Sequence, residues 1–164
     1  MNLTIRCEKK SEYQYLYHFV KEVFKTAHIS DGDEQEFVNQ LRNSKNYIPE
    51  LALVALDNHQ IIGHIMLTNY PLNGMLLLAP LSIDIHYRKK GVGTLLVQRA
   101  LTLAKEMNYK SVLVLGDPNY YSRFGFKPSI DFGIHCTNDI PEQYVQLLEL
   151  EENALKSVVG NITF

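Results

Sequence analysis

The residues of this chain whose types and spacing most clearly offer chemistry lie in a short basic turn. In order, they are Arg88, Lys89, Lys90, Gly91, Val92, Gly93 and Thr94. The glycines allow a sharp turn and leave the backbone open to a ligand. If a helix begins here, its first N–H groups are unpaired and lie at the positive end of the helix dipole. Together with the basic side chains, these amides would suit a pyrophosphate or another anionic group.

A second interpretation of this turn is that the glycines serve only the geometry of a basic strand-to-helix connection. Short glycine motifs recur by chance, so the turn alone does not decide between the two interpretations. Two other nucleotide-binding motifs fit less well. A dinucleotide fingerprint needs a third small residue where Leu96 stands. A P-loop needs Gly-Lys followed by Ser or Thr after a longer loop, and the sequence contains none.

A strand–helix–strand unit would position the turn. An apolar run at 75–85 predicts a strand, which Pro80 makes irregular because proline cannot donate a ladder hydrogen bond. Apolar residues spaced three and four apart predict a helix over 93–107, and 111–115 predicts another buried strand. A bend at the proline could open a gap between neighbouring strands.

The flanking segments complete a mixed α/β domain. Before the unit, the sequence predicts a strand, two helices, and a two-stranded hairpin at 3–8, 12–25, 34–42, 51–56 and 61–70. After it, the sequence predicts a short helix, a possible strand and two further strands at 119–124, 134–137, 144–150 and 157–164. Ser11 and Asp33 are candidate caps of the two early helices. The second helix is expected to turn inward Phe37, Val38 and Leu41.

Composition narrows the class of protein. The 164 residues are expected to form a single domain, 1–164, and 46% hydrophobic with 21% charged residues is an ordinary globular mixture. A formal net charge of −2 provides no basic field for nucleic acid or a membrane surface. Cys7 and Cys136 lack metal-ligand spacing and fit a reduced compartment, so no metal is expected. No signal-peptide pattern or membrane-length apolar run is present, and we expect a cytoplasmic protein.

With these segments in view, the sequence resembles the GNAT superfamily of coenzyme-A-dependent N-acyltransferases. Residues 81–93 resemble the family's central strand and its Arg/Gln-x-x-Gly-x-Gly/Ala turn, and 111–115 resemble its next strand. Residues 121–126 resemble its Tyr-x-x-x-Gly-Phe segment. The tract 116–128 and the tail 147–160 are also similar to a bacterial subgroup of predicted acetyltransferases, the YhbS type.

The resemblance implies an α/β (α+β) fold with a mixed, mostly antiparallel sheet, splayed between its fourth and fifth strands and covered by helices on both faces. It implies acetyl-CoA as co-substrate. The pantetheine arm would lie in the splay, held by the backbone of Leu81, Ser82 and Ile83. The pyrophosphate would rest on the amides of 89–94, with Arg88 adding charge, which matches the anion site read from the residues.

The implied reaction is direct transfer of an acetyl group from acetyl-CoA to a primary amine of a small molecule or peptide. A backbone N–H near Ile83 would polarise the thioester carbonyl. Tyr121 would protonate the departing sulfur, since a phenol of pKa about 10 suits a thiolate of similar basicity. Tyr121 could instead be a packed helix residue. Asn119 either bonds the pantetheine arm or only caps the short helix.

The general base is not identified by the sequence. The candidates by residue type are Glu50, His64, Asp84, His86 and Asp117. Asp117 precedes Pro118 and fits a helix cap better, and the two histidines are expected to face solvent. A water chain would also serve. Cys136 is not needed as a nucleophile because the transfer is direct, and buried cysteines usually only pack.

The acceptor substrate is expected to be selected by residues 24–35 and 128–140. Their polar residues mildly favour a cationic amine and are His28, Asp31, Asp33, Glu34, Asp131 and Asp139. The main rival is a non-catalytic acyl-CoA-binding or sensor domain. A nucleic-acid-associated modifier is disfavoured because aromatic residues do not alternate with basic ones. The strand edge expected at 157–164 offers a place where a second copy could pair, giving a homodimer.

Overall fold

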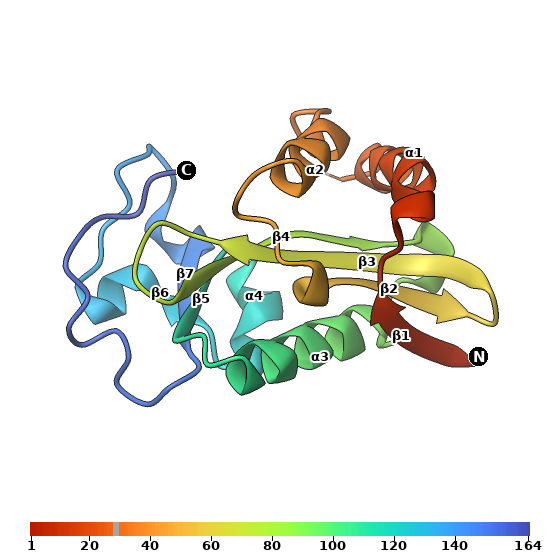
Figure 1. The fold of residues 1–164 in the computed structure, drawn as a ribbon. Helices are drawn as coiled ribbons and strands as arrows, with labels where there is room; N and C mark the ends of the chain where they lie inside the picture. The colour runs from red at the N-terminus through yellow and green to blue at the C-terminus, as the bar shows by residue number, and fades with distance from the viewer. Residues whose placement is uncertain (28–29) are drawn as a thin grey trace. The chain divides into compact units, whose positions relative to one another are not determined.

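The computed structural model describes residues 1–27 and 30–164, and His28 of the expected acceptor loop lies outside the described residues. Seven strands form a sheet in the order β1-β2-β3-β4-β5-β7-β6 (Figure 1). They are β1 Leu3–Cys7, β2 Ala52–Asp57, β3 Gln60–Asn69, β4 Met75–Ile83, β5 Ser111–Leu115, β6 Lys127–Pro128 and β7 Val145–Glu149. β4 and β5 are parallel, whereas β1–β2, β2–β3, β5–β7 and β6–β7 are antiparallel. The mixed, mostly antiparallel sheet is therefore confirmed.

Four α-helices and several 3₁₀ turns connect the strands. The α-helices are α1 Tyr13–Phe24, α2 Glu34–Arg42, α3 Val92–Glu106 and α4 Pro118–Tyr121. The 3₁₀ turns are η1 Lys10–Glu12, η2 Pro49–Leu51, η3 Ile85–Tyr87, η4 Ser122–Phe124, η5 Ser129–Phe132 and η6 Glu142–Tyr144. The predicted helix over 93–107 and strand at 111–115 are confirmed within a residue of their expected bounds.

The chain divides into two compact units. The first comprises Met1–Thr68 and Pro80–Leu103, and the second comprises Asn69–Ala79 and Ala104–Phe164. β4 and α3 each pass from one unit into the other. The single domain expected over 1–164 stays a prediction.

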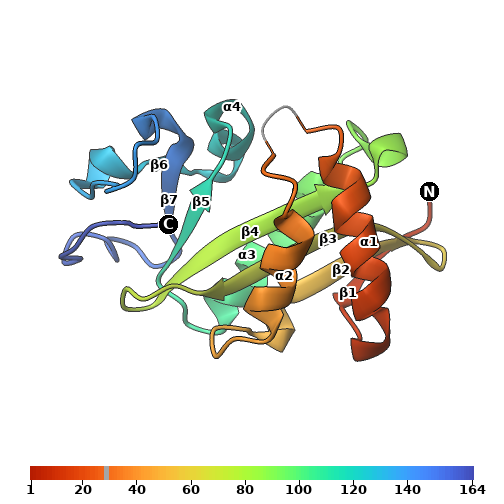
Figure 2. The same ribbon diagram turned by 90° about the horizontal axis from the view of Figure 1, so that it is seen from above.

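In the first unit, α1 and α2 cover one face of the β1–β3 strands and α3 covers the opposite face (Figures 1 and 2). Leu16 and Val20 of α1 pack on buried β2 and β3 residues. On the other face, Gly63 allows close approach, because a Cβ there would lie 2.8 Å from Leu96 of α3 and 3.2 Å from Ile83. Helices on both faces are therefore confirmed in this unit.

The starts of α1 and α2 differ from the prediction in detail. Ser11 does not cap α1, which begins at Tyr13, because residues 10–12 form the separate turn η1. The Glu12 carboxylate instead accepts a 2.8 Å hydrogen bond from the Lys9 N–H. Asp33 occupies the N-cap position of α2 without a side-chain capping bond. Phe37 is 38% exposed, so its predicted inward orientation is wrong, whereas Val38 is buried.

The second unit is built around β5, which pairs with β4 on one side and β7 on the other. Its buried core comprises Met75, Leu113, Ile134, Val145, Leu147, Leu155 and Ile162. The strand predicted at 144–150 is confirmed, but the one at 157–164 is wrong. That segment holds a single bridge, between Ile162 and Cys136, and Gly160 adopts a φ of +142° that interrupts extended backbone. The predicted edge for a homodimer is therefore not a strand.

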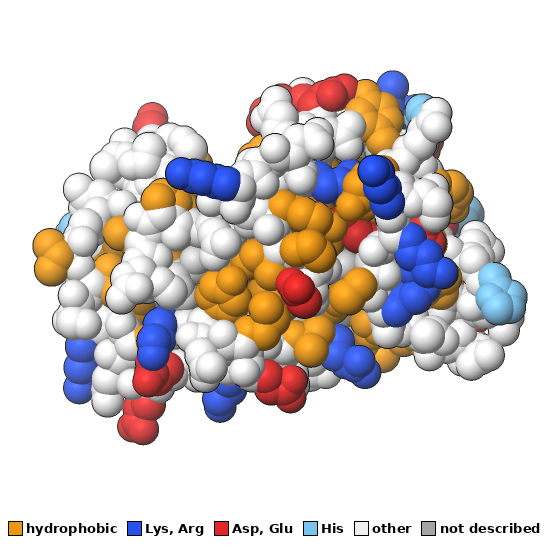
Figure 3. Space-filling view, viewed as in Figure 1, with side chains coloured by type: hydrophobic (Ala, Val, Ile, Leu, Met, Phe, Trp, Pro, Cys, Tyr) orange, Lys and Arg blue, Asp and Glu red, His pale blue; other side chains and the backbone are white. Residues whose placement is uncertain are grey.

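The surface shows no concentration of one charge over the face drawn in Figure 3. Lys and Arg side chains are scattered there among acidic and apolar ones. Within the described residues, none of the helices is long and apolar enough to cross a membrane. Among the same residues, no group of three His, Cys, Asp or Glu side chains is arranged to hold a metal ion.

Candidate functional site

The basic turn after β4 does lead into a helix N-terminus. Lys89 and Gly91 both adopt positive φ, +61° and +85°, so the chain reverses sharply before α3 begins at Val92. The Leu95 N–H bonds the Gly91 carbonyl at 3.1 Å. The amides of residues 91–94 precede this bond and have no acceptor within the helix. They lie at the positive end of a fifteen-residue helix, where an anion is stabilised.

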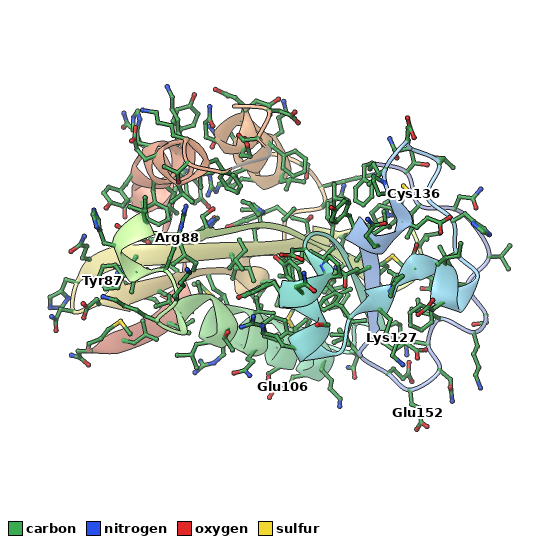
Figure 4. The ribbon with its side chains drawn as sticks, turned by 180° about the vertical axis from the view of Figure 1, so that it is seen from behind. Tyr87, Arg88, Glu106, Lys127, Cys136 and Glu152 are labelled. Carbon is green, nitrogen blue, oxygen red and sulfur yellow. The ribbon has the colours of Figure 1, made fainter. Side chains whose placement is uncertain are left out.

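The side chains of the turn are tied to the rest of the first unit (Figure 4). The Tyr87 hydroxyl donates to Asp57 at 2.8 Å, and this bond raises the pKa of the tyrosine. One Arg88 nitrogen donates to the Val23 carbonyl and to the Thr26 hydroxyl, both at 3.1 Å. Arg88 therefore holds the end of α1 against the turn, a role that its sequence position did not reveal.

One bond after β4 indicates its register against β3 at that end of the strand. The Asp84 N–H donates to the Ile62 carbonyl at 2.9 Å. In an antiparallel pair this bond places Ser82 opposite His64, with the backbone groups of Ser82 directed toward β3. At the other end the Tyr70 N–H bonds the Met75 carbonyl at 3.1 Å, a register shifted by one residue, so the pairing is irregular in between.

The backbone groups of Leu81 and Ile83 consequently point away from β3. On that side of β4, the parallel ladder joins residues 75–78 to 111–114 and then ends. Ala79 and Leu115 follow in the same unit, yet the residues described show no pairing between them, although β5 stays paired with β7 as far as Leu115. The pairing between the fourth and fifth strands therefore ends at Leu78.

In the second unit, the segment after β5 forms the short helix α4. The Asp117 carboxylate accepts a 2.9 Å bond from the Asn119 N–H, and Pro118 takes the first helical position. The interpretation of Asp117 as a cap is confirmed. Asn119 is exposed. Gly125 closes η4 in the left-handed region at φ +95°.

Tyr121 is 8% exposed and packs among aromatic rings. The ring centroids of Tyr120 and Phe126 lie 5.0 and 5.6 Å from its own. A side chain on Gly116 would overlap the Tyr121 ring, so this glycine makes room for the tyrosine. Burial, and secondarily the charge of Tyr120, raises the pKa of Tyr121. The phenol therefore keeps its proton at neutral pH.

The late segment expected to select the acceptor lines a hollow of about 200 Å³ in the second unit. Its walls are Ser129, Ile130, Ile134, His135, Cys136, Asn138, Ile140, Glu142 and Val145. The last two residues lie beyond the predicted range 128–140. Cys136 has its sulfur 3.7 Å from Asn138 Oδ1.

A buried polar cluster in the first unit was missed from the sequence. His64 is fully buried, so its predicted exposure is wrong, and its Nε2 lies 2.8 Å from Glu8 Oε1. Arg42 bonds both Glu8 oxygens at 2.8 and 2.9 Å, and the Tyr47 hydroxyl donates to Glu8 at 2.7 Å. Burial raises the pKa of Glu8, but hydrogen bonds from His64 and Arg42 outweigh it and lower the pKa to about 2.

The contacts within this cluster could hardly be predicted from the sequence, because its members come from four separate segments. His64, however, stands inside a nearly continuous apolar strand, between Ile62 and Met66. Strands of that composition are buried on both faces. This pattern was the available signal that the histidine is internal.

The comparisons with known proteins agree with this geometry. The family model for the acetyltransferase (GNAT) family matches residues 14–126, more than half of the chain. The chain belongs to the GNAT acetyltransferase family. This GNAT chain is 33% identical over 136 residues to the uncharacterized N-acetyltransferase YhbS of Escherichia coli K12, and the match covers 80% of each protein.

Two solved GNAT structures resemble the fold closely. One is E. coli YhbS in complex with CoA, with a TM-score of 0.88, 27% identity, and coverage of 100% of this chain and 90% of that chain. The other is a GNAT family acetyltransferase from Brucella melitensis in complex with acetyl-CoA, with a TM-score of 0.77, 25% identity, and coverage of 92% and 89%. The resemblance to the YhbS type is thus confirmed.

Proposed function

We propose that this GNAT protein is an acetyl-CoA-dependent N-acetyltransferase that moves an acetyl group directly to a primary amine of a small molecule or peptide. The observation that carries the proposal is the turn before α3, where positive φ at Gly91 exposes the unpaired amides of a helix N-terminus. The binding of CoA by E. coli YhbS and of acetyl-CoA by the Brucella protein supports the same co-substrate here.

In this proposal the coenzyme's pyrophosphate accepts hydrogen bonds from the amides of 89–94. Nothing lies within 4 Å of the position where a Gly91 side chain would begin, which leaves space for the phosphates. Lys89 and Lys90 supply charge. Arg88 contributes indirectly, by fixing the turn to α1. The pantetheine arm pairs along β4 with the backbone groups that point away from β3.

The chemical steps need few side chains. The Ile83 N–H polarises the thioester carbonyl while the amine nitrogen attacks its carbon. The C–S bond then breaks, and Tyr121 gives its proton to the departing sulfur. The raised pKa of Tyr121 supports this role in one respect, since it keeps the proton available on the phenol. Asn119, exposed on α4, is proposed to bond the pantetheine arm.

The choice of an amine acceptor is supported by Glu34 at the start of α2. Its Oε2 is buried and has no hydrogen-bond partner among residues 1–27 and 30–164. Its other oxygen accepts from the Ser30 hydroxyl. A carboxylate oxygen without a partner favours a cationic group, such as the ammonium of an acceptor held before deprotonation.

The test is to incubate the purified protein with acetyl-CoA and a panel of primary amines, and to follow free thiol. We expect thiol release that depends on the amine, with the acetylated amine detected by mass spectrometry. Glu34→Gln should raise KM for cationic amines more than for neutral ones. Tight CoA binding with no turnover across the panel would overturn the proposal of an enzyme and favour a non-catalytic acyl-CoA sensor domain. The cytoplasmic location stays a prediction.

A further inference from the structure

Two buried polar atoms on neighbouring strands lack hydrogen-bond partners within the part of the chain that the structure describes. They are Nδ1 of His64 on β3 and Oγ of Ser82 on β4. Both residues have 0% exposure. Native proteins rarely leave such atoms unpaired, and each that they do leave calls for an explanation. Two of them at one position point to a function that uses both.

The register brings these atoms together. Ser82 lies opposite His64, and directly opposite residues of an antiparallel pair project on the same face. Their Cβ atoms are about 5 Å apart in such pairs. At that spacing the Ser82 hydroxyl and the His64 ring are neighbours on one face of the sheet.

The protonation of His64 follows from its partner. Glu8 is ionised at neutral pH, because its pKa is lowered to about 2, and a carboxylate can only accept hydrogen bonds. Nε2 must therefore carry the hydrogen in the 2.8 Å contact with Glu8. In a neutral imidazole this leaves the lone pair on Nδ1, the ring atom without a partner among the described residues.

Arg42 and Tyr47 are the other groups that bond the Glu8 carboxylate. Arg42 neutralises Glu8 through two hydrogen bonds, and the Tyr13 ring lies 4.1 Å below its guanidinium. The Tyr47 hydroxyl donates to the same carboxylate. On the other neighbouring strand, Val54 of β2 pairs with His64 and brings no charge. Only the Nδ1 lone pair remains to receive a proton.

We propose that Ser82 and His64 form a proton relay that deprotonates the acceptor amine during acetyl transfer, an inference that rests on the proposed function. Ser82 directly precedes Ile83, whose N–H is proposed to hold the thioester oxygen. An amine attacking that carbonyl meets the Ser82 hydroxyl. Ser82 is then a catalytic residue, whereas Glu8 acts through His64 and is a positioning residue.

Atoms and charge are conserved in the proposed transfer. As the nitrogen–carbon bond forms, the amine proton passes to Ser82 Oγ, and the Ser82 hydroxyl proton passes to His64 Nδ1. The C–S bond breaks and the sulfur takes the Tyr121 proton. Once the amide has left, the fully buried imidazolium of His64 returns its proton to solvent through the Ser82 hydroxyl, and the phenolate of Tyr121 regains one, so that both groups are restored.

The decisive variant is Ser82→Ala, because removing an unpaired hydroxyl leaves the packing intact. With the best amine of the panel, we expect kcat to fall by about 100-fold or more with unchanged CoA affinity. The dependence of kcat on pH should change as well. Ser82→Thr, which keeps a hydroxyl, should restore part of the rate.

Thr68→Val is the matched control. Thr68 also carries a buried hydroxyl without a partner among the described residues, on the same strand as His64. Its loss should leave kcat and the pH profile unchanged. The relay is overturned if Ser82→Ala stays within about threefold of the parent with the same pH profile.

A wild-type protein that releases no thiol would refute the proposed function, and the relay then has a separate readout. Nitrogen-15 NMR of the histidines should show hydrogen on Nε2 of His64 and an Nδ1 shift that changes in Ser82→Ala. Hydrogen on Nδ1 of the neutral ring, or an Nδ1 shift insensitive to Ser82→Ala, would overturn the relay whatever the activity.

Discussion

The Glu8 carboxylate offers the sharpest test of how the first unit is held together. Its replacement in Glu8→Gln keeps the shape of the side chain and removes the charge, leaving Arg42 buried without a counter-ion. The Glu8 and Arg42 side chains are 0% and 4% exposed. Breaking a buried pair of this kind costs about 3–5 kcal/mol.

The pKa of Glu8 gives an independent magnitude. The difference between its ordinary value of 4.5 and about 2, at 1.36 kcal/mol per pH unit, corresponds to about 3 kcal/mol. Because the pKa is depressed in the folded state, this stability is present above pH 4.5. It is lost as the pH falls from 4.5 toward about 2.

The assay is thermal and urea unfolding followed by circular dichroism at pH 7 and pH 3. At pH 7, Glu8→Gln should lose about 3 kcal/mol, which lowers Tm by about 6–12 °C for a chain of this size. At pH 3 the gap to the parent should narrow. Glu22→Gln, which removes an exposed partner of Lys25, is the control and should leave stability nearly unchanged. The reasoning is refuted if the difference in unfolding free energy between parent and variant is below about 1 kcal/mol at pH 7, or if it is the same at pH 3 as at pH 7.

Three substitutions test the proposed coenzyme and acid sites. Gly91→Val should weaken CoA binding at least tenfold, as measured by calorimetry. The control is Gly133→Val, at a similarly open position with a φ of +74°. The control should carry a similar backbone strain of about 1–3 kcal/mol but bind CoA normally. Tyr121→Phe should lower kcat with little change in CoA affinity. The control Tyr109→Phe should change neither kcat nor CoA affinity. Equal kcat values in the two variants would make Tyr121 structural. Gly116→Ala should destabilise the protein by about 1–3 kcal/mol in urea unfolding, because its Cβ would overlap the Tyr121 ring.

The sequence was most informative where local patterns decide structure. The helix after the glycine turn and the strand at 111–115 follow from apolar periodicity over a single segment, and both are confirmed. The last segment, 157–164, shows the limit of this reasoning. Its apolar residues resemble a strand, yet Ile162 instead enters the core of the second unit and makes a single bridge.

Contacts between distant segments could not be predicted. Arg88 was predicted to add charge at the phosphate, which stays a prediction, but its bonds to the end of α1, more than sixty residues earlier in the chain, were not foreseen. His64 was expected at the surface, but a carboxylate from the end of β1 and an arginine from α2 accompany it inside. The free main-chain amides at the start of α3 could be predicted, because they depend only on a glycine turn followed by a helix.

The measurement that tests the central claim most directly is an NMR titration of the nitrogen-15-labelled protein with CoA. We expect the largest shifts on the amides of 89–94 and on those of Leu81 and Ile83, where phosphates and pantetheine would bond the backbone. Saturable binding that leaves these amides unchanged, or no binding at millimolar CoA, would contradict it.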